Sequence, residues 1–344
     1  MAPSPLVQEG FVELGGRRTW FRAIGEPTDL PALLVLHGGP GGGSANDHPF
    51  AATIARERQI VMYDQIESGR SQRLGDPSAL TMDNFIAELD AVRAAFGLER
   101  VHVIGESWGG MLAMEYALTR PAGLVSIITA GSPFSTAQWM AAATEFRAAL
   151  PSRVQRALAR CEATIARHPR PLKVGGEPTE AKVAKKAQAL SKQSKLGLAP
   201  PVQAIGRAMS YLPPLRRIAY DVVGFEFVHR HVIRMTPVPA GAAAQTAASN
   251  LATYEHLWGP SEFEATGPLR EWDITDRLAE IDTPMLITSG AYECVTPAHV
   301  RAALSQLPSA QWVLFEHSAH VSSYEEPERF TTVLQEFLTK TDGR

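Results

Sequence analysis

One serine in this sequence lies between glycines, where an apolar stretch gives way to a helical pattern. Gly105, Ser107 and Gly109 fit the pattern G-x-S-x-G, and the preceding run VHVI (residues 101–104) favours a β-strand. The pattern is typical of a nucleophile held at a sharp strand-to-helix turn. Glycine neighbours suit such a turn because they lack side chains that would clash with a strained serine. We therefore predict that Ser107 is a nucleophile.

A glycine-rich segment, LHGGPGGG (residues 36–43), ends the first strongly apolar stretch. Attack on a carbonyl needs two backbone N–H donors aimed at the developing oxyanion. We expect one donor from Trp108, directly after the serine, and the other from Gly39. A phosphate-binding loop is the alternative, but no Lys-Ser/Thr pair follows, and Pro40 and Ser44 interrupt the G-x-G-x-x-G spacing.

A serine nucleophile needs a histidine base, and an acid must hold that histidine in one tautomer. His320 lies just beyond a late apolar run and is the predicted base, with His317 as the alternative. The acid is expected after the preceding strand, because the chain order for such a site is Ser, acid, His. Glu293 occupies that position and is the predicted acid.

Short apolar runs alternate with helical patterns at both ends of the chain. Runs of this length, separated by helices such as the one expected over residues 81–96, are typical of strands buried on both faces of a parallel sheet. The sequence therefore predicts an α/β fold with a mostly parallel central sheet. The expected strands are residues 32–38, 59–64, 101–105, 124–131, 284–290 and 311–316.

The strand-like runs stop in the middle of the chain, where the sequence becomes helical, alanine-rich and basic. Three proline clusters interrupt this part, and no repeat is evident. We predict a helical cap over residues 134–270, inserted between a first core segment (residues 1–133) and a second one (residues 271–344). A cap above a sheet is a common place for a substrate pocket.

The composition is that of an ordinary globular protein, with 45% hydrophobic residues, 20% charged residues and a formal net charge of −3. The basic stretch at residues 181–195 is expected to be a solvated helix face, so nucleic acid is not an expected partner. No apolar run approaches the roughly 20 residues of a membrane span, and a cytoplasmic enzyme without membrane contact is expected. Two cysteines are too few for a disulfide framework or a sulfur metal site, and neither a metal nor a cofactor is implied.

Several motifs together resemble the proline iminopeptidase family of α/β-hydrolases. HGGPGGG, YDQIESGRS and GESWGG stand in that family's order and approximate spacing. The stretch at residues 259–297 is similar to the branch of tricorn-interacting aminopeptidases and amino acid amide hydrolases. The resemblance implies an α/β-hydrolase fold with a cap. Residues 150–220 show no match.

The resemblance implies a serine hydrolase that acts beside a small amino-terminal residue, in a short peptide or an amino acid amide. It gives Ser107, His320 and Glu293 the roles predicted above, in a mechanism that passes through an acyl-enzyme. It also implies that Glu262 binds the free α-amine of the substrate. A charged hydrogen bond of this kind contributes about 1.5 to 3 kcal/mol to binding. Tyr254 is a further candidate substrate-binding residue.

The sequence departs from the family at three positions. The acid is Glu293 where the family usually has aspartate, and Glu67 replaces a glycine. Cys294 stands where the aminopeptidase branch has a second amine-binding glutamate, which makes it a candidate for altered substrate binding. An esterase, a lactonase or an amide hydrolase for substrates without a free amine is therefore the alternative. A ligand-binding protein without activity is a third hypothesis. The natural substrate and the oligomeric state do not follow from the sequence.

Overall fold

The computed structural model describes residues 5–44 and 48–343, so residues 1–4 and 45–47 of the expected first core segment and residue 344 of the second lie outside the described part. Eight strands within the described residues form one sheet, in the order β1-β2-β4-β3-β5-β6-β7-β8. Strands β3 to β8 are mutually parallel where they pair, while β1 and β2 join the edge in antiparallel fashion. Their bounds are β1 (Val7–Leu14), β2 (Arg17–Ile24), β3 (Ala32–Leu36), β4 (Ile60–Tyr63), β5 (Val101–Glu106), β6 (Leu124–Ala130), β7 (Met285–Gly290) and β8 (Ala310–Phe315).

Strands β3 to β8 confirm all six predicted strands. The central strands β3, β4, β5 and β7 are buried along their whole length, as expected for strands covered on both faces. The hairpin of β1 and β2 was not predicted. Strand β1 alternates exposed and half-buried residues at the sheet edge, so it lacks the continuous apolar run that marks the inner strands.

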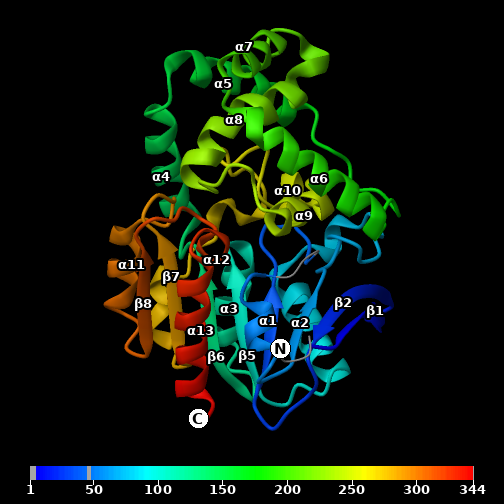
Figure 1. The fold of residues 1–344 in the computed structure, drawn as a ribbon, viewed down its shortest axis with the longest axis vertical. Helices are drawn as coiled ribbons and strands as arrows, with labels where there is room; N and C mark the ends of the chain where they lie inside the picture. Colours follow the sequence, from blue (N-terminus) through cyan, green and yellow to red (C-terminus); the bar gives the residue numbers. More distant parts are fainter. Residues whose placement is uncertain (1–4, 45–47, 344) are drawn as a thin grey trace.

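Helices cover both faces of the sheet (Figure 1). One face packs against α2 (Met82–Ala95), α3 (Trp108–Leu118) and α11 (Pro297–Leu304), and the other packs against α1 (Ala51–Ile54) and α13 (Pro327–Thr341). Helix α2 confirms the helix expected at residues 81–96, and the Thr81 hydroxyl caps it by accepting a hydrogen bond from the backbone N–H of Asn84. A short helix, α12 (Ser322–Glu325), precedes α13.

Further helices lie above one end of the sheet, and we refer to them as the cap helices (Figure 1). They are α4 (Thr136–Ala148), α5 (Ser152–Arg167), α6 (Glu180–Gly197), α7 (Pro200–Met209), α8 (Arg216–His231), α9 (Ala240–Ala248) and α10 (Leu251–Leu257).

The chain leaves the sheet layer and returns to it at the same place. The N–H of Thr136 donates to the carbonyl of Trp272, and the N–H of Ile274 donates to the carbonyl of Phe134. These bonds support our proposal that residues 134–270 are inserted between two core segments.

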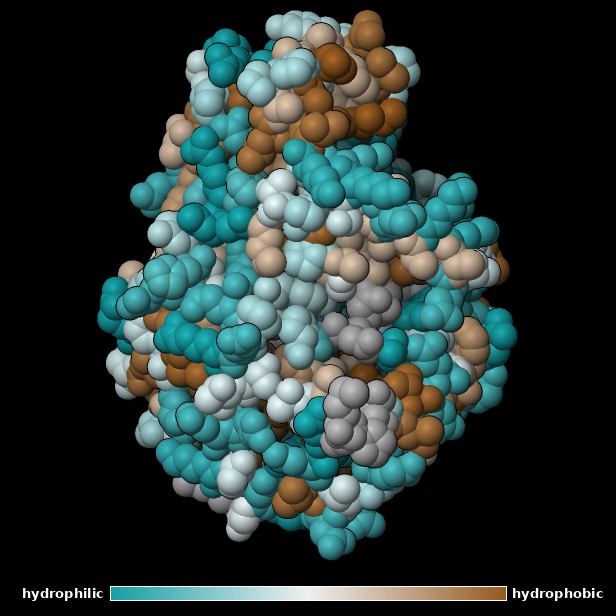
Figure 2. Space-filling view, viewed as in Figure 1, coloured by the Kyte–Doolittle hydropathy of each residue, from teal (hydrophilic) through white to brown (hydrophobic). Residues whose placement is uncertain are grey.

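The surface of the cap helices is unusual at their outer end. Figure 2 shows apolar side chains gathered at the top of the view, over the α7 end of the molecule, while polar residues dominate the rest of that face. Among the described residues, no helix combines the length and the apolar character that a membrane crossing requires. The exposed apolar residues of this region are Leu196, Leu198, Ile205, Tyr211, Leu212 and Ile218.

Candidate functional site

Ser107 occupies the turn between β5 and α3. Its backbone has φ of 56° and ψ of −118°, a conformation that costs free energy for any residue other than glycine. The glycines on either side of it are required by close packing. A Cβ atom on Gly105 would lie 2.1 Å from the backbone of Gly109, and a Cβ atom on Gly109 would lie 2.3 Å from the carbonyl oxygen of Leu36. The predicted strand-to-helix turn is therefore present, with the serine at its tip.

The glycine-rich loop after β3 passes next to this turn. A Cβ atom on Gly38 would lie 3.4 Å from the Cβ atom of Ser107, and Gly39 has a φ of 128°, in the region that favours glycine. Trp108 is the first residue of α3, so its N–H has no acceptor within the helix. Gly39 and Trp108 line the same pocket as Ser107, the positions expected of two oxyanion donors.

Gln65, to which the sequence analysis gave no role, connects these elements. Its backbone N–H donates to Nε2 of His37 at 3.0 Å, and its side-chain oxygen accepts a hydrogen bond from Nε1 of Trp108 at 2.8 Å. It therefore links the glycine-rich loop to the first residue of α3. The available signal was its position directly after β4, at the carboxyl end of a buried parallel strand, where ligand sites gather in α/β folds.

Glu293 and His320 form a buried pair on the loops after β7 and β8. Oε2 of Glu293 lies 2.7 Å from Nδ1 of His320, and Oε1 accepts a hydrogen bond from the N–H of Gly290 at 2.7 Å. Gly131, at the end of β6, packs against both side chains, and a Cβ atom there would lie 2.8 Å from Nδ1 of His320. The preceding residue, Ala130, accepts a hydrogen bond from the N–H of Ser107. The structure thus brings the three residues together around the end of β6.

The electrostatics of this pair shift the pKa of both groups upward. Burial on its own would lower the pKa of His320, but the hydrogen bond and the charge of Glu293 outweigh it, so this pKa lies above its ordinary value. Burial raises the pKa of the Glu293 carboxyl, and the hydrogen bonds from His320 and Gly290 oppose that shift. The alternative base, His317, is exposed, and its backbone N–H donates to Glu326.

A small pocket adjoins the serine. Trp139 stands edge-on to the His320 ring at 5.2 Å and to the Trp258 ring at 6.2 Å, so two indole rings form one wall. Neither tryptophan had a sequence signal, because each comes from a cap segment with no motif. The pocket is lined by Gly39, Pro40, Ser107, Trp108, Met111, Pro133, Trp139, Trp258 and Glu262.

Glu262 is the carboxylate of this pocket. Its Oε1 accepts a hydrogen bond from the hydroxyl of Tyr254 at 2.7 Å, so the structure brings these two predicted residues together. Burial raises the pKa of the Glu262 carboxyl, and the Tyr254 hydroxyl and the charge of His320 oppose this shift. Cys294 is buried, and its thiol pKa is raised by burial and by the carboxylates of Glu262 and Glu293. A neutral thiol thus lies near both carboxylates.

Glu67, which the resemblance marks as a departure from a glycine, has a φ of 55°. This left-handed conformation explains why a glycine suits the position. Hydrogen bonds hold Glu67 in this conformation. Its carboxylate accepts from the N–H groups of Leu74 and Gly75. Its carbonyl accepts from the side chains of Asn250, the N-cap of α10, and Thr253 within that helix. The substitution is therefore built into the contact between the loop after β4 and the cap.

The C-terminal end of α8 holds the loops of both the acid and the base. The carbonyl of Val232 accepts hydrogen bonds from the N–H groups of His320 and Val321. Nδ1 of His231 lies 2.8 Å from the carbonyl oxygen of Tyr292, next to the acid. The position of the cap helices is thereby coupled to the geometry of the Glu293–His320 pair.

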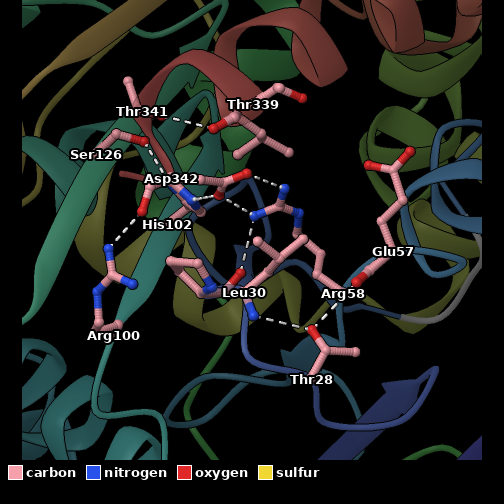
Figure 3. Close-up of polar contacts among 12 residues, drawn as sticks. Thr28, Leu30, Glu57, Arg58, Arg100, His102, Ser126, Thr339, Thr341 and Asp342 are labelled. Atoms are coloured by element: carbon pink, nitrogen blue, oxygen red, sulfur yellow. Dashed lines mark hydrogen bonds and ion pairs between the residues drawn. The ribbon is translucent and has the colours of Figure 1, made fainter. Parts of the chain in front are cut away.

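A second cluster of serine, histidine and carboxylate lies at the other end of the sheet (Figure 3). Nδ1 of His102 lies 2.7 Å from Oγ of Ser126, and Nε2 lies 3.0 Å from Oδ1 of Asp342. The guanidinium of Arg58 donates to both carboxylate oxygens of Asp342, at 2.6 and 2.8 Å. This cluster joins the end of α13 to the sheet.

Comparison with known proteins agrees with the fold and with the resemblance. The α/β hydrolase fold family model matches residues 31–204. The proline iminopeptidase of Lactobacillus delbrueckii subsp. lactis is 30% identical over 342 residues, which cover 98% of this chain and 99% of that protein. The proline iminopeptidase of Levilactobacillus brevis is 31% identical over 339 residues, 98% of each chain.

Two crystal structures match over nearly the whole chain. VinJ superimposes with a TM-score of 0.78 at 28% identity, covering 97% of this chain and 99% of VinJ. The proline iminopeptidase of Mycobacterium smegmatis superimposes with a TM-score of 0.73 at 31% identity, with the same coverage. The sheet, the turn at Ser107 and these similarities lead to one conclusion: the chain belongs to the proline iminopeptidase family of α/β-hydrolases and is a serine hydrolase.

Proposed function

We propose that this enzyme hydrolyses the bond after a small amino-terminal residue, in short peptides or amino acid amides with a free α-amine. The observation that carries the proposal is that Glu262 and Ser107 line one small pocket. No Lys or Arg of the described residues forms an ion pair with Glu262, whose hydrogen-bond partner is the neutral hydroxyl of Tyr254. A substrate ammonium group supplies the positive charge that this carboxylate favours.

In the proposed mechanism, Ser107 attacks the scissile carbonyl while His320 accepts its hydroxyl proton. Glu293 holds the imidazole through Nδ1 and stabilises the imidazolium that forms. The N–H groups of Gly39 and Trp108 stabilise the oxyanion. His320 then donates the proton to the leaving amine, and a water that it activates hydrolyses the acyl-enzyme.

The lining of the pocket favours a small apolar residue. The rings of Trp139 and Trp258 and the side chain of Met111 surround the space beside Ser107 with apolar surface, which suits a compact group such as a prolyl or alanyl side chain. The likeness of residues 259–297 to the aminopeptidase and amide hydrolase branch supports the same substrate class.

The alternative is an ester, lactone or blocked amide substrate without a free amine. One observation favours it: Cys294 is a neutral buried thiol where the aminopeptidase branch has a second glutamate, so a substrate amine would have one carboxylate partner. A singly anchored amine is bound less selectively.

A matched pair of substrates tests the proposal. We expect kcat/KM for prolyl or alanyl p-nitroanilide to exceed that for the N-acetylated compound by about 10- to 100-fold, the effect of losing one charged hydrogen bond. Glu262→Gln should remove most of this preference. Glu264→Gln is the control, because Glu264 belongs to the same turn but does not line the pocket. Equal rates for both compounds in the unmodified enzyme would favour the alternative substrate class.

A further inference from the structure

Glu106, the residue between Gly105 and the nucleophile, has a buried side chain that the mechanism above does not use. Successive side chains of a strand alternate between its two faces, so Glu106 lies on the same face as Ile104 and opposite to the face covered by α3. The residue is only 9% exposed. It therefore places a carboxylate inside the layer between the sheet and helices α12 and α13.

The surroundings of this carboxylate are mostly apolar. It lines a small cavity whose walls include one other titratable group, the imidazole of His48, and no Lys or Arg. Charges interact more strongly in such an environment than in water. The cavity is lined by Val35, His48, Phe50, Ile104, Glu106, Ala130, Ser323 and Phe330.

Glu106 has a hydrogen-bond partner on the element that follows the base. The hydroxyl of Ser323, in α12, donates to Oε1 of Glu106 at 3.1 Å. Ser323 is buried and lies three residues after His320. One hydrogen bond thus connects the residue directly before Ser107 to the short helix directly after His320.

Four carboxylates act on His320 from four different elements. Glu293 does so through its hydrogen bond, and Glu106, Glu262 and Glu325 act through their charges. Glu325 is partly offset by Arg234, and Glu262 faces the substrate pocket. Glu106 differs from both: it lies on the sheet side of His320, away from the substrate pocket, and no Lys or Arg lines its cavity.

We propose that Glu106 is a positioning residue of this enzyme, which fixes α12 against β5 through Ser323 and stabilises the protonated imidazole of His320 through its charge. The inference rests on the proposed roles of Ser107 and His320. When the bond from Oγ of Ser107 to the electrophile forms, the hydroxyl proton passes to His320 and the imidazolium appears. A negative charge on the sheet side lowers the free energy of that state without touching the substrate.

The test uses a fluorophosphonate, because its reaction does not depend on which substrate the enzyme prefers. In that reaction the Ser107 Oγ–P bond forms, fluoride leaves and His320 takes the proton. The labelling rate is measured at constant ionic strength between about pH 5 and pH 9, where a histidine base titrates. The proteins compared are the unmodified enzyme, Glu106→Gln, Ser323→Ala and, as the control, Glu336→Gln, which removes an exposed carboxylate from α13.

The expected results separate charge from position. Glu106→Gln keeps an oxygen that can accept a hydrogen bond from Ser323 but loses the charge. In the plot of labelling rate against pH, the rise on the acid side (the acid limb) should therefore move to lower pH by about 0.5 to 1 unit. The plateau of the labelling rate (the limiting rate) should also fall. Ser323→Ala should leave the acid limb in place and lower the limiting rate by about 3- to 10-fold, because positioning is lost. Glu336→Gln should match the unmodified enzyme.

An unmoved acid limb in Glu106→Gln would overturn the electrostatic role, and an unchanged limiting rate in Ser323→Ala would overturn the tether. If Glu106→Gln fails to fold by circular dichroism, Glu106→Asp replaces it: the charge stays while the hydrogen bond is strained, so the limb should stay and the rate should fall. A shifted limb in Glu106→Asp contradicts the proposal. Labelling that persists in Ser107→Ala would instead mean that the proposed nucleophile is wrong, a distinct outcome.

Discussion

Two clusters of serine, histidine and carboxylate lie at opposite ends of β5, and they differ in almost every physical respect. At the carboxyl end, Ser107 follows the strand near the Glu293–His320 pair. At the other end, His102 within the strand contacts Ser126 and Asp342. The side-chain chemistry of the two clusters is nearly the same. The comparison therefore isolates what else an active site requires.

The first difference is the protonation of the histidine. Burial lowers the pKa of His102 to about 4, the hydrogen bond to Asp342 opposes this, and the charge of Arg58 adds to it. The Asp342 carboxylate is shared with Arg58, which weakens its effect on the imidazole. Glu293 is not shared with any Lys or Arg among the described residues, and the pKa of His320 is raised. Of these two histidines, His320 is therefore the one suited to accept a proton near neutral pH.

The second difference is access. Ser126 lies within β6 and is fully buried, whereas Ser107 lies at a strained turn and lines a pocket with Gly39 and Glu262. The turn at Ser107 also provides the backbone N–H of Trp108 at a helix start. The strained backbone, the adjacent N–H donors and the adjoining pocket, rather than the identity of the three side chains, distinguish the candidate active site.

The largest expected effect separates the two serines. Ser107→Ala should lower kcat by about 10³- to 10⁶-fold with little change in the urea midpoint, because it removes the nucleophile but no core contact. Ser126→Ala should keep kcat and lower the free energy of unfolding by about 1 kcal/mol, the value of one hydrogen bond. Kinetics and urea unfolding of both variants measure this. Loss of activity in Ser126→Ala with an unchanged free energy of unfolding would mean that the second cluster also takes part in catalysis.

The next effect concerns the acid of the site. Glu293→Ala should lower kcat by about 10²- to 10⁴-fold, because His320 loses the group that orients it and stabilises its charge. Glu293→Asp should retain more activity, since a shorter carboxylate can still accept from Nδ1 if the loop adjusts. Steady-state kinetics of the two variants tests this order. An unaffected Glu293→Ala enzyme would mean that another residue serves as the acid.

A carboxylate of the second cluster should affect stability and leave catalysis intact. Asp342→Ala leaves the guanidinium of Arg58, which is 1% exposed, without its ion-pair partner. The loss of one partner of a buried pair costs about 3 to 5 kcal/mol. The free energy of unfolding should fall by this amount, while kcat measured well below the melting temperature should stay close to that of the unmodified enzyme. A changed kcat would mean that the cluster around Asp342 influences catalysis at the other end of β5.

The smallest effect is the pH dependence of stability that His102 contributes. Its folded-state pKa of about 4 lies below the ordinary value of 6.5, so the unfolded chain binds more protons between these values. The stability that depends on His102 being neutral is fully present above about pH 6.5. The free energy of unfolding should fall by about 2 kcal/mol when the pH is lowered from 7 to 5. Urea unfolding at both pH values should show a smaller loss in His102→Gln. An equal loss in both proteins would assign the effect to other groups.

The fold could largely be predicted from the sequence. The central strands β3, β4, β5 and β7 are buried on both faces, so each appears as a continuous apolar run, and β6 and β8 carry apolar runs as well. The hairpin of β1 and β2 escaped prediction because β1 is mostly exposed and polar residues interrupt the apolar residues of β2, so neither strand has a continuous apolar run.

The candidate site was only partly predictable. Ser107 carries a local motif, because the glycines that a tight turn needs are its sequence neighbours. The contributions of Trp139 and Glu106 could not be recognised, since each depends on a partner far away in the sequence: His320 and Ser323 respectively.

The sequence by itself determined strands β3 to β8, the strand-to-helix turn and the three candidate residues of the site, because local periodicity and local backbone strain leave a local pattern. Only the tertiary structure shows the physical reason why His320, and not His102, is poised to accept a proton. His102 and His320 each have a carboxylate neighbour. What separates them is burial, the competing charge of Arg58 and the pocket beneath the cap helices. These properties arise when distant segments pack together, because desolvation and Coulomb interactions depend on distance in space and not on distance along the chain.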